Sequence, residues 1–179
     1  MNANLDSKGS VYWLTGLSGA GKTTLCIMLV EYLRKHNKSV VMLDGDKLRE
    51  VIGATNAHTR KDRLKLSMQY SRLCQMISKQ GVNVAISTIS LFHEVHRWNR
   101  INIPGYVEIY LKVPIEELRR RDSKQIYERA AHGQIKNVAG LDFAIDEPKM
   151  PDIKIEWIPT LTVEASLEQL INKLKIGEN

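Results

Sequence analysis

Short apolar runs alternate with amphipathic stretches along most of this chain. The runs predict five buried β-strands, at residues 11–15, 39–43, 82–88, 107–113 and 153–157. Hydrophobic residues recur at helical spacing in three further stretches, at residues 25–34, 66–77 and 167–174. Strands that alternate with helices in this way form parallel sheets covered on both faces. The pattern therefore predicts an α/β three-layer sandwich.

Two segments depart from this alternation. Residues 1–10 are polar and lack the apolar stretch of a signal peptide, so we interpret them as a tail before the first strand. Residues 119–147 are strongly charged and show no clear apolar face. A segment of this kind between two strands is typical of a mobile lid over a ligand site. Residues 11–179, which contain no repeat or linker, are predicted to form a single domain.

The sequence GLSGAGKTT, residues 16–24, joins the first predicted strand to the first predicted helix. It matches the phosphate-loop pattern G-x-x-x-x-G-K-[ST], in which glycines let the backbone curl around a polyphosphate. The helix that follows presents its positive end to the same ligand. This context predicts a P-loop NTPase-type fold that binds ATP. The expected ATP-binding residues are Gly16, Leu17, Ser18, Gly19, Ala20, Gly21, Lys22, Thr23 and Thr24.

Polar residues gather after the second and third predicted strands. Asp44 and Asp46 lie at the end of the second strand, and Ser87, Thr88 and Ser90 lie at the end of the third. Ligands of open α/β sheets bind at these strand ends. A carboxylate opposite a phosphate loop can hold Mg²⁺ or accept a proton from an attacking hydroxyl, although a turn or helix cap is the alternative for Asp-Gly-Asp. We predict that Asp44 and the Thr23 hydroxyl hold Mg²⁺.

Composition and charge narrow the function classes. The 179 residues carry a net charge of +6, but the basic residues are scattered rather than interleaved with aromatic ones, which disfavours a nucleic-acid-binding role. No apolar run approaches the roughly 20 residues that span a bilayer. Cys26 and Cys74 lie in apolar helical patterns, which favours two packed thiols over a disulfide. We expect a cytoplasmic protein whose partner is a small molecule rather than a nucleic acid or a membrane.

Several motifs together resemble the adenylylsulfate kinases. They are the phosphate loop, LDGD at 43–46 with Arg49, KVP at 112–114, RD at 121–122, and QIKN at 134–137 followed by GLD at 140–142. The resemblance runs over residues 11–157. It implies a P-loop kinase that uses ATP and Mg²⁺ to phosphorylate the ribose 3′-hydroxyl of adenylyl sulfate. A homodimer is a candidate for the oligomeric state of the protein.

The resemblance also implies roles for individual residues. Lys22 serves ATP, Asp46 is the candidate base, and Arg121 is the first choice among the lid arginines that offset charge in the transition state. Arg49 and Arg63 match the family's acceptor-binding arginines, and Lys136 matches the lysine of its lid motif. The predicted acceptor-binding residues are Asp46, Arg49, His58, Arg63, Ile89, Ser90, Lys136 and Val138.

The chain departs from the family where the acceptor base is bound. His58 and Val138 stand where the family has two phenylalanines that sandwich the adenine, and such stacking is worth about 1–3 kcal/mol per base. One interpretation is a divergent adenylylsulfate kinase whose pocket is closed by His58, Phe92 or Phe143. The other is a sister kinase for a cytidine diphosphate-type acceptor such as cytidine diphosphoramidate. A regulator that binds ATP without turnover is the competing class.

Overall fold

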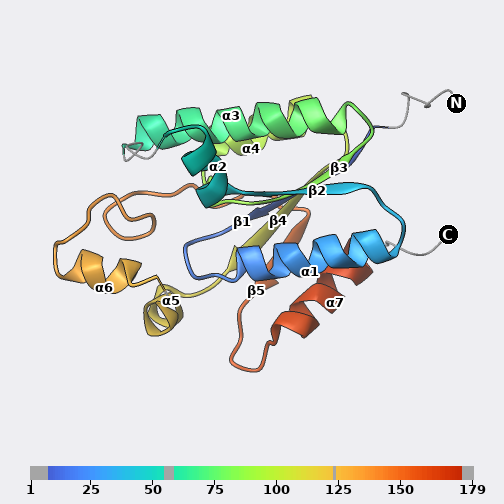
Figure 1. Cartoon of the computed structure of the whole chain (residues 1–179). Coiled ribbons are helices and arrows are strands. Elements are labelled where there is room, and N and C mark those ends of the chain that lie inside the picture. The colour runs from blue at the N-terminus through green and yellow to red at the C-terminus, as the bar shows by residue number, and fades with distance from the viewer. Residues whose placement is uncertain (1–7, 55–58, 123, 175–179) are drawn as a thin grey trace, which may run out of the picture.

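The computed structural model describes residues 8–54, 59–122 and 124–174 and has a five-stranded parallel sheet at its centre (Figure 1). The strands are β1 (Val11–Thr15), β2 (Val40–Asp44), β3 (Asn83–Ser87), β4 (Tyr106–Lys112) and β5 (Ile153–Glu156). The helices assigned in the described part are α1 (Lys22–Lys35), α2 (Gly45–Val51), α3 (Arg60–Ser78), α4 (His93–Asn102), α5 (Ile115–Arg121), α6 (Ile126–Ala131) and α7 (Val163–Leu174). The strand order is β2-β3-β1-β4-β5, so the loop after β1 emerges at the centre of the sheet, where the strand order reverses.

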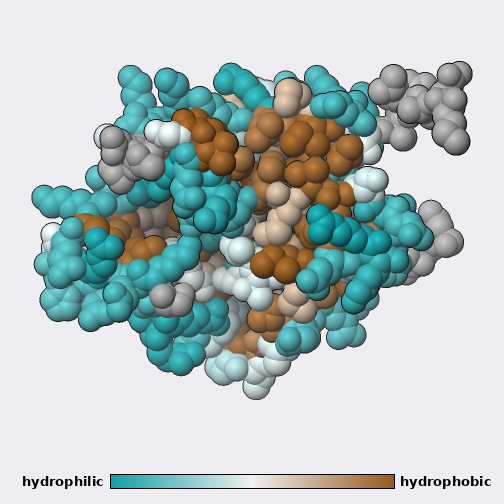
Figure 2. Space-filling model, in the orientation of Figure 1, coloured by the Kyte–Doolittle hydropathy of each residue, from teal (hydrophilic) through white to brown (hydrophobic). Residues whose placement is uncertain are grey.

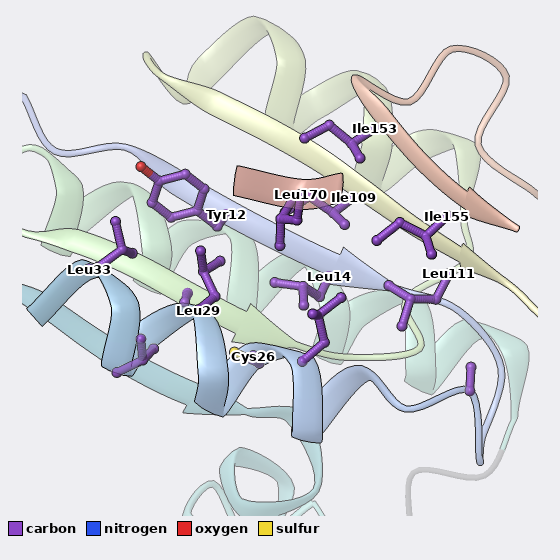
Figure 3. Close-up of a cluster of buried hydrophobic side chains, with 14 of the residues drawn as sticks. Tyr12, Leu14, Cys26, Leu29, Leu33, Ile109, Leu111, Ile153, Ile155 and Leu170 are labelled. Carbon is purple, nitrogen blue, oxygen red and sulfur yellow. The ribbon is translucent and has the colours of Figure 1, made fainter. Parts of the chain in front are cut away.

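Helices cover both faces of the sheet, in agreement with the predicted three-layer sandwich. Alternate residues of β1 point to opposite faces. Tyr12 and Leu14 join the hydrophobic cluster under α1 and α7, which also holds Leu170 (Figure 3). Val11 and Trp13 join the cluster under α3 and α4. Full burial of such apolar side chains contributes about 1.5–3 kcal/mol each, so β1 is anchored from both sides and fixes the start of the loop that follows it.

The predicted strands all occur, and each of their ends lies within one residue of the predicted position. The predicted helices start too late, because the first turn of a helix is polar and does not contribute to the amphipathic pattern. Thr59 caps α3 by accepting a hydrogen bond from the Asp62 backbone N–H, so this helix begins at Arg60 rather than near residue 66. The sequence pattern did not predict α2, α4, α5 and α6.

The lid segment, residues 119–147, was predicted to be polar with no clear apolar face, but it contains buried hydrophobic side chains. Its buried hydrophobic residues are Tyr127, Val138, Ala139 and Phe143. The hydroxyl of Tyr127 donates to the Ser18 carbonyl oxygen at 2.8 Å. A Cβ on Gly140, whose φ is +83°, would lie 2.9 Å from the Leu17 side chain. The lid segment therefore packs directly on the phosphate loop, and glycine at position 140 permits the close approach.

The two cysteines are free and buried, which confirms the prediction of packed thiols. Burial raises the pKa of the Cys26 thiol to about 12. Because the thiolate is the reactive form, this side chain is a packing residue rather than a nucleophile.

Hydrophobic side chains also reach the surface over the C-terminal half of α3 and the neighbouring β2 (Figure 2). Met76 is 56% exposed, and Val41 of the edge strand β2 is 37% exposed. Among the described residues, none of the helices combines the length and the apolarity that a bilayer crossing requires.

Candidate active site

A cavity of about 730 Å³, called here the main cavity, lies beyond the carboxyl ends of β2 and β3 and against the loop that follows β1. The phosphate loop, α2, α3 and the lid segment form its walls. Hydrophilic side chains dominate the left of Figure 2, where Figure 1 places α2 above α5 and α6. The predicted site residues that line the cavity are Ser18, Gly19, Gly21, Lys22, Thr23, Thr24, Asp44, Asp46, Arg49, Arg63, Ile89, Lys136 and Val138. The structure thus brings most of the predicted site residues, from segments far apart in the chain, to one cavity.

The phosphate loop has the backbone conformation that its glycines allow. Gly16 has a φ of +149°, and a Cβ there would lie 2.6 Å from the Leu111 carbonyl oxygen. Gly21 is the N-cap of α1 in the left-handed region, and no side chain caps the helix. The first N–H groups of α1 are therefore available to an anion beside Gly21 and Lys22, which both line the main cavity.

The Lys22 ammonium lies in the main cavity under the phosphate loop. Its Nζ donates to the Leu17 carbonyl oxygen at 2.7 Å. Burial lowers the pKa of Lys22 to about 8, because the favourable fields of Asp46 and Asp44 only partly offset desolvation and the repulsion from Lys124. The ammonium is still charged at neutral pH but poorly solvated. Phosphate oxygens would provide the missing counter-charge.

Asp44 connects the ends of β2 and β3 with the phosphate loop. Its Oδ2 accepts from the Thr23 hydroxyl at 3.0 Å and from the Ser87 hydroxyl at 2.7 Å. Its Oδ1 accepts from the Asp46 backbone N–H at 3.0 Å, so Asp44 is also the N-cap of α2. Burial raises the pKa of Asp44, but the hydrogen bonds from Ser87 and Thr23 outweigh it and lower the pKa overall. Asp44 is therefore an ionised residue that both caps α2 and stands at the position predicted to hold Mg²⁺.

Asp46 forms an ion pair that the sequence did not predict. Its Oδ2 lies 2.6 Å from Nζ of Lys124 in the lid segment. Both side chains are more than half exposed, which limits the contribution of the pair to folding stability. The pair nevertheless links the candidate base to the lid. Lys124 lines the main cavity, as Lys136 of the lid segment does, whereas Arg121 does not.

Arg49 and Arg63 form a cationic wall of the main cavity. The Nε atoms of both guanidiniums are buried and have no hydrogen-bond partner in the described ranges. Burial and the neighbouring Arg49 lower the pKa of Arg63, whereas Asp142 opposes this shift. Two close, incompletely paired guanidiniums are suited to an anionic ligand with several oxygens. This arrangement is consistent with the predicted acceptor-binding role of both residues.

The wall beside these arginines is mainly aliphatic. Leu66, Ile89 and Val138 line the main cavity, together with Tyr70, whose hydroxyl donates to the Gly45 carbonyl oxygen at 2.9 Å. Tyr70 is buried to the same degree as Leu66, and its ring is the one aromatic ring in the described lining. The described lining contains no phenylalanine or tryptophan.

Phe92 and Phe143, which were candidates for closing the acceptor pocket, lie elsewhere. Both rings are buried and contact each other edge to face, with centroids 6.2 Å apart. Arg63 covers the Phe143 ring, with its Cζ 5.1 Å from the ring centroid, and Arg60 covers Phe92 at 5.2 Å. Phe143 thus packs against one arginine of the cationic wall, Phe92 packs against Arg60, and neither phenylalanine lines the main cavity. His58, the third candidate, lies outside the described residues.

Arg121 is the predicted catalytic residue that the structure does not bring beside Lys22 and Asp46. Its Nε donates to Glu117 Oε1 at 2.7 Å, and its Nη1 lies 3.4 Å from the Gly19 carbonyl oxygen. The guanidinium also covers the Trp157 ring at 5.8 Å. Glu117 is held ionised, because hydrogen bonds from Arg120 and Arg121 lower its pKa to about 2. These contacts hold Arg121 in a smaller cavity.

This smaller cavity, of about 80 Å³, lies on the other side of the phosphate loop. Ala20 and Gly21 of the loop line it, as do Arg121 and Trp157. Leu17 and Gly16 do not line either cavity; they form the packed base of the loop.

Ser90 is buried behind the wall of the main cavity instead of lining it. Its hydroxyl donates to Ser67 Oγ at 2.8 Å and lies 2.8 Å from Thr88 Oγ1. Ser67 and Thr88 line the cavity, so Ser90 reaches the site through them. Thr88 was expected among the polar residues at the end of the third strand but was given no role, and Ser67 was not predicted.

The sequence model of the family described as adenylylsulphate kinase matches residues 8–156 of this chain. The chain belongs to the adenylylsulfate kinase family. The matched range contains the phosphate loop, Asp44, Asp46 and the lid segment, so the whole main cavity lies within the family domain. As a member of this kinase family, the protein is an enzyme, a phosphotransferase.

Relatives with two different named activities resemble this adenylylsulfate kinase family member over nearly its whole length. The cytidine diphosphoramidate kinase of Campylobacter jejuni is 36% identical, over 93% of this chain and 96% of the relative. The adenylyl-sulfate kinase of Picosynechococcus is 33% identical, over 95% of this chain and 96% of the relative.

A solved structure of the family has the same fold. The APS kinase of Mycobacterium tuberculosis, in complex with AMPPNP and APS, superposes with a TM-score of 0.86 and 27% identity. The match covers 94% of this chain and 99% of that chain. The P-loop kinase fold expected from the sequence is confirmed.

Proposed function

We propose that this kinase transfers the γ-phosphoryl group of ATP to the ribose 3′-hydroxyl of a cytidine diphosphate-type nucleotide, with cytidine diphosphoramidate as the specific candidate. The observation that carries this choice is the aliphatic wall formed by Leu66, Ile89 and Val138 beside Arg49 and Arg63. An adenine acceptor gains much of its affinity from aromatic platforms, whereas a pyrimidine offers a smaller face to stack. The similarity to a cytidine diphosphoramidate kinase supports the same acceptor.

ATP is the proposed phosphoryl donor, held by the phosphate loop and Lys22. The residues present also fit a Mg²⁺ ion. Thr23 Oγ1 and Asp44 Oδ2 are hard oxygen donors 3.0 Å apart at the edge of the phosphate site. The described residues contain no cluster of three or more His, Cys, Asp or Glu side chains that could hold a metal alone. Mg²⁺ characteristically takes one or two protein ligands and completes its shell with water and substrate phosphates. When bound, it would neutralise charge on the β- and γ-phosphate oxygens.

The proposed reaction is a direct transfer. The acceptor hydroxyl oxygen forms a bond to the γ-phosphorus while the bond from that phosphorus to the β–γ bridging oxygen breaks, and ADP leaves. Asp46 orients the hydroxyl and accepts its proton. Lys22 and the N–H groups of α1 bind the phosphate oxygens. Arg49 and Arg63 hold the diphosphate-type group of the acceptor, which keeps the hydroxyl in line with the donor.

The decisive test compares the two acceptors directly. We expect ADP release, coupled to a spectroscopic readout, to show a higher kcat/KM for cytidine diphosphoramidate than for adenylyl sulfate. A preference for adenylyl sulfate would refute the proposed acceptor and assign the protein to sulfate activation. ATP binding without turnover of either nucleotide would instead favour the non-catalytic class.

A substitution in the aliphatic wall tests the reasoning behind the acceptor. Val138→Phe restores an aromatic ring at the position where the family has phenylalanine, and we expect it to shift the kcat/KM ratio toward adenylyl sulfate by about tenfold. Val51→Phe is the matched control, because Val51 is 83% exposed and does not line the main cavity. An unchanged ratio in a folded Val138→Phe protein would show that this wall does not select the base.

A further inference from the structure

His96 is a buried residue of α4 that does not line the main cavity. Its Nε2 lies 3.1 Å from the carbonyl oxygen of Ser90. A carbonyl oxygen only accepts hydrogen bonds, so this contact requires the proton on Nε2. Nδ1 then carries a lone pair and has no hydrogen-bond partner in the part of the chain that the structure describes. The Glu108 carboxylate is 3.8 Å from it, beyond hydrogen-bonding distance.

The surroundings keep the imidazole neutral. Burial lowers the pKa of His96 to about 4, and the neighbouring His93 and Arg100 act in the same direction. The Ser90 carbonyl and Asp146 oppose this shift without cancelling it. His96 is thus a fixed N–H donor at neutral pH and not a cation paired with a carboxylate.

The acceptor of this hydrogen bond belongs to a strained turn. Ser90 is not glycine, yet its φ is +30°, in a region that other residues occupy only when their surroundings hold them there. The hydroxyl of Thr15 at the end of β1 donates to the Ile89 carbonyl oxygen. The Ser90 carbonyl oxygen also accepts from the Phe92 backbone N–H at 3.0 Å, a bond within the turn itself. His96 therefore ties this carbonyl to the side chains of α4, and Thr15 ties the preceding carbonyl to the sheet.

The turn contributes to the lining of the main cavity. The Ile89 side chain lines the aliphatic wall. The Ser90 hydroxyl oxygen lies 2.8 Å from the hydroxyl oxygens of Thr88 and Ser67. Thr88 and Ser67 line the cavity, whereas Ser90 does not. Loss of the bond from His96 would loosen the turn that carries Ile89 and Ser90 and disturb the contacts of the Ser90 hydroxyl with Thr88 and Ser67, whereas Lys22 and the phosphate loop belong to another segment.

We propose that His96 is a positioning residue for the acceptor: its Nε2–H holds the Ser90 carbonyl and thereby fixes the turn that carries Ile89 and Ser90, whose hydroxyl contacts those of Thr88 and Ser67. The proposal rests on the proposed function in that the main cavity binds a nucleotide acceptor, but it does not depend on which base that acceptor carries. It assigns a function to a residue that touches neither substrate.

Steady-state kinetics of two variants test the assignment, with the acceptor that the wild-type enzyme uses better. His96→Leu removes the donor, and we expect the acceptor KM to rise about tenfold, the effect of one lost hydrogen bond, while the ATP KM and kcat stay within about twofold. His96→Gln places an amide N–H near the position of Nε2 and is expected to recover most of the acceptor affinity. A role in stability alone would predict no such recovery and no separation of the two KM values.

Two further measurements separate this inference from fold damage and from failure of the proposed function. Val95→Ala is the matched control, because Val95 is a fully buried neighbour on α4 that lines no part of the main cavity. We expect it to lower Tm and leave the acceptor KM unchanged. Hydrogen exchange of a peptide spanning residues 88–92 should speed up in His96→Leu but not in His96→Gln, whichever nucleotide is the acceptor.

The inference would be overturned by an unchanged acceptor KM in folded His96→Leu, or by an equal rise in Val95→Ala. If the wild-type enzyme turned over neither acceptor, the proposed function would fail. The exchange of residues 88–92 would then decide the role of His96, and equal exchange in the wild type and His96→Leu would reject it.

Discussion

Asp46→Asn is expected to lower kcat by about 10²–10⁴-fold while leaving Tm unchanged. The amide keeps the size of the carboxylate and can still accept a hydrogen bond, but it cannot take the proton of the acceptor hydroxyl. The Asp46 side chain is 63% exposed and contributes no buried packing, so the fold has little to lose. Initial rates at saturating ATP and acceptor, together with a thermal melt of the same preparation, provide the measurement.

Two controls separate proton transfer from other roles of Asp46. Glu50→Gln makes the same chemical change on the same helix, α2, at an exposed residue that does not line the main cavity, and it should leave kcat unchanged. Lys124→Met breaks the ion pair from the lid side. If Asp46 acted only by holding Lys124, this variant would lose as much activity as Asp46→Asn. Near-normal turnover by folded Asp46→Asn would remove the aspartate from the mechanism.

The parts of the site that could be predicted from sequence are those fixed by local rules. Gly16 and Gly21 signal a backbone conformation, and the alternation of buried strands predicts which loops meet at one edge of the sheet. These rules predict that Lys22, Asp44 and Asp46 lie together, and the main cavity contains all three. They also gave strand ends within one residue, because β1 and its neighbours are buried on both faces.

The parts that could not be predicted depend on contacts between distant residues. Lys124 meets Asp46 across 78 positions of sequence, and no periodicity links a lid lysine to a strand-end aspartate. Phe92 and Phe143 could have closed the acceptor pocket by composition alone, yet they pack on each other under Arg60 and Arg63. An aromatic residue near a site contributes stacking only if its face reaches the ligand, which is a property of packing.

The short helices were missed for a related reason. A helix of seven residues, such as α2, makes fewer than two turns with one buried residue, so its amphipathic signal is too weak to detect. The start of α2 depends on capping by Asp44. A helix cap was the predicted alternative to a ligand role for this residue. The structure shows that the cap and the cavity position are compatible, because the two carboxylate oxygens have different partners.

The second large effect concerns Lys22, for which activity and stability are expected to change in opposite directions. Lys22→Met should lower kcat by about 10²–10³-fold, because the phosphates lose a preorganised cation. In the free protein the same change should raise Tm. The folded state lowers the pKa of Lys22 from 10.5 to about 8, which corresponds to an unfavourable term of about 3 kcal/mol for the charged form at neutral pH. Loss of the hydrogen bond to Leu17 offsets part of this gain.

The pH dependence of stability distinguishes this explanation from a simple gain in packing. Between pH about 8 and 10.5 the unfolded wild type holds the Lys22 proton more tightly than the folded state, so wild-type stability should rise with pH in this window. Methionine cannot titrate, so the advantage of Lys22→Met should be largest near neutral pH and shrink as the pH approaches about 10. An advantage independent of pH, or a lower Tm at neutral pH, would show that the lysine is not destabilising in the free protein. ATP should stabilise the wild type and have much less effect on the variant, because the ammonium that phosphate compensates would be absent.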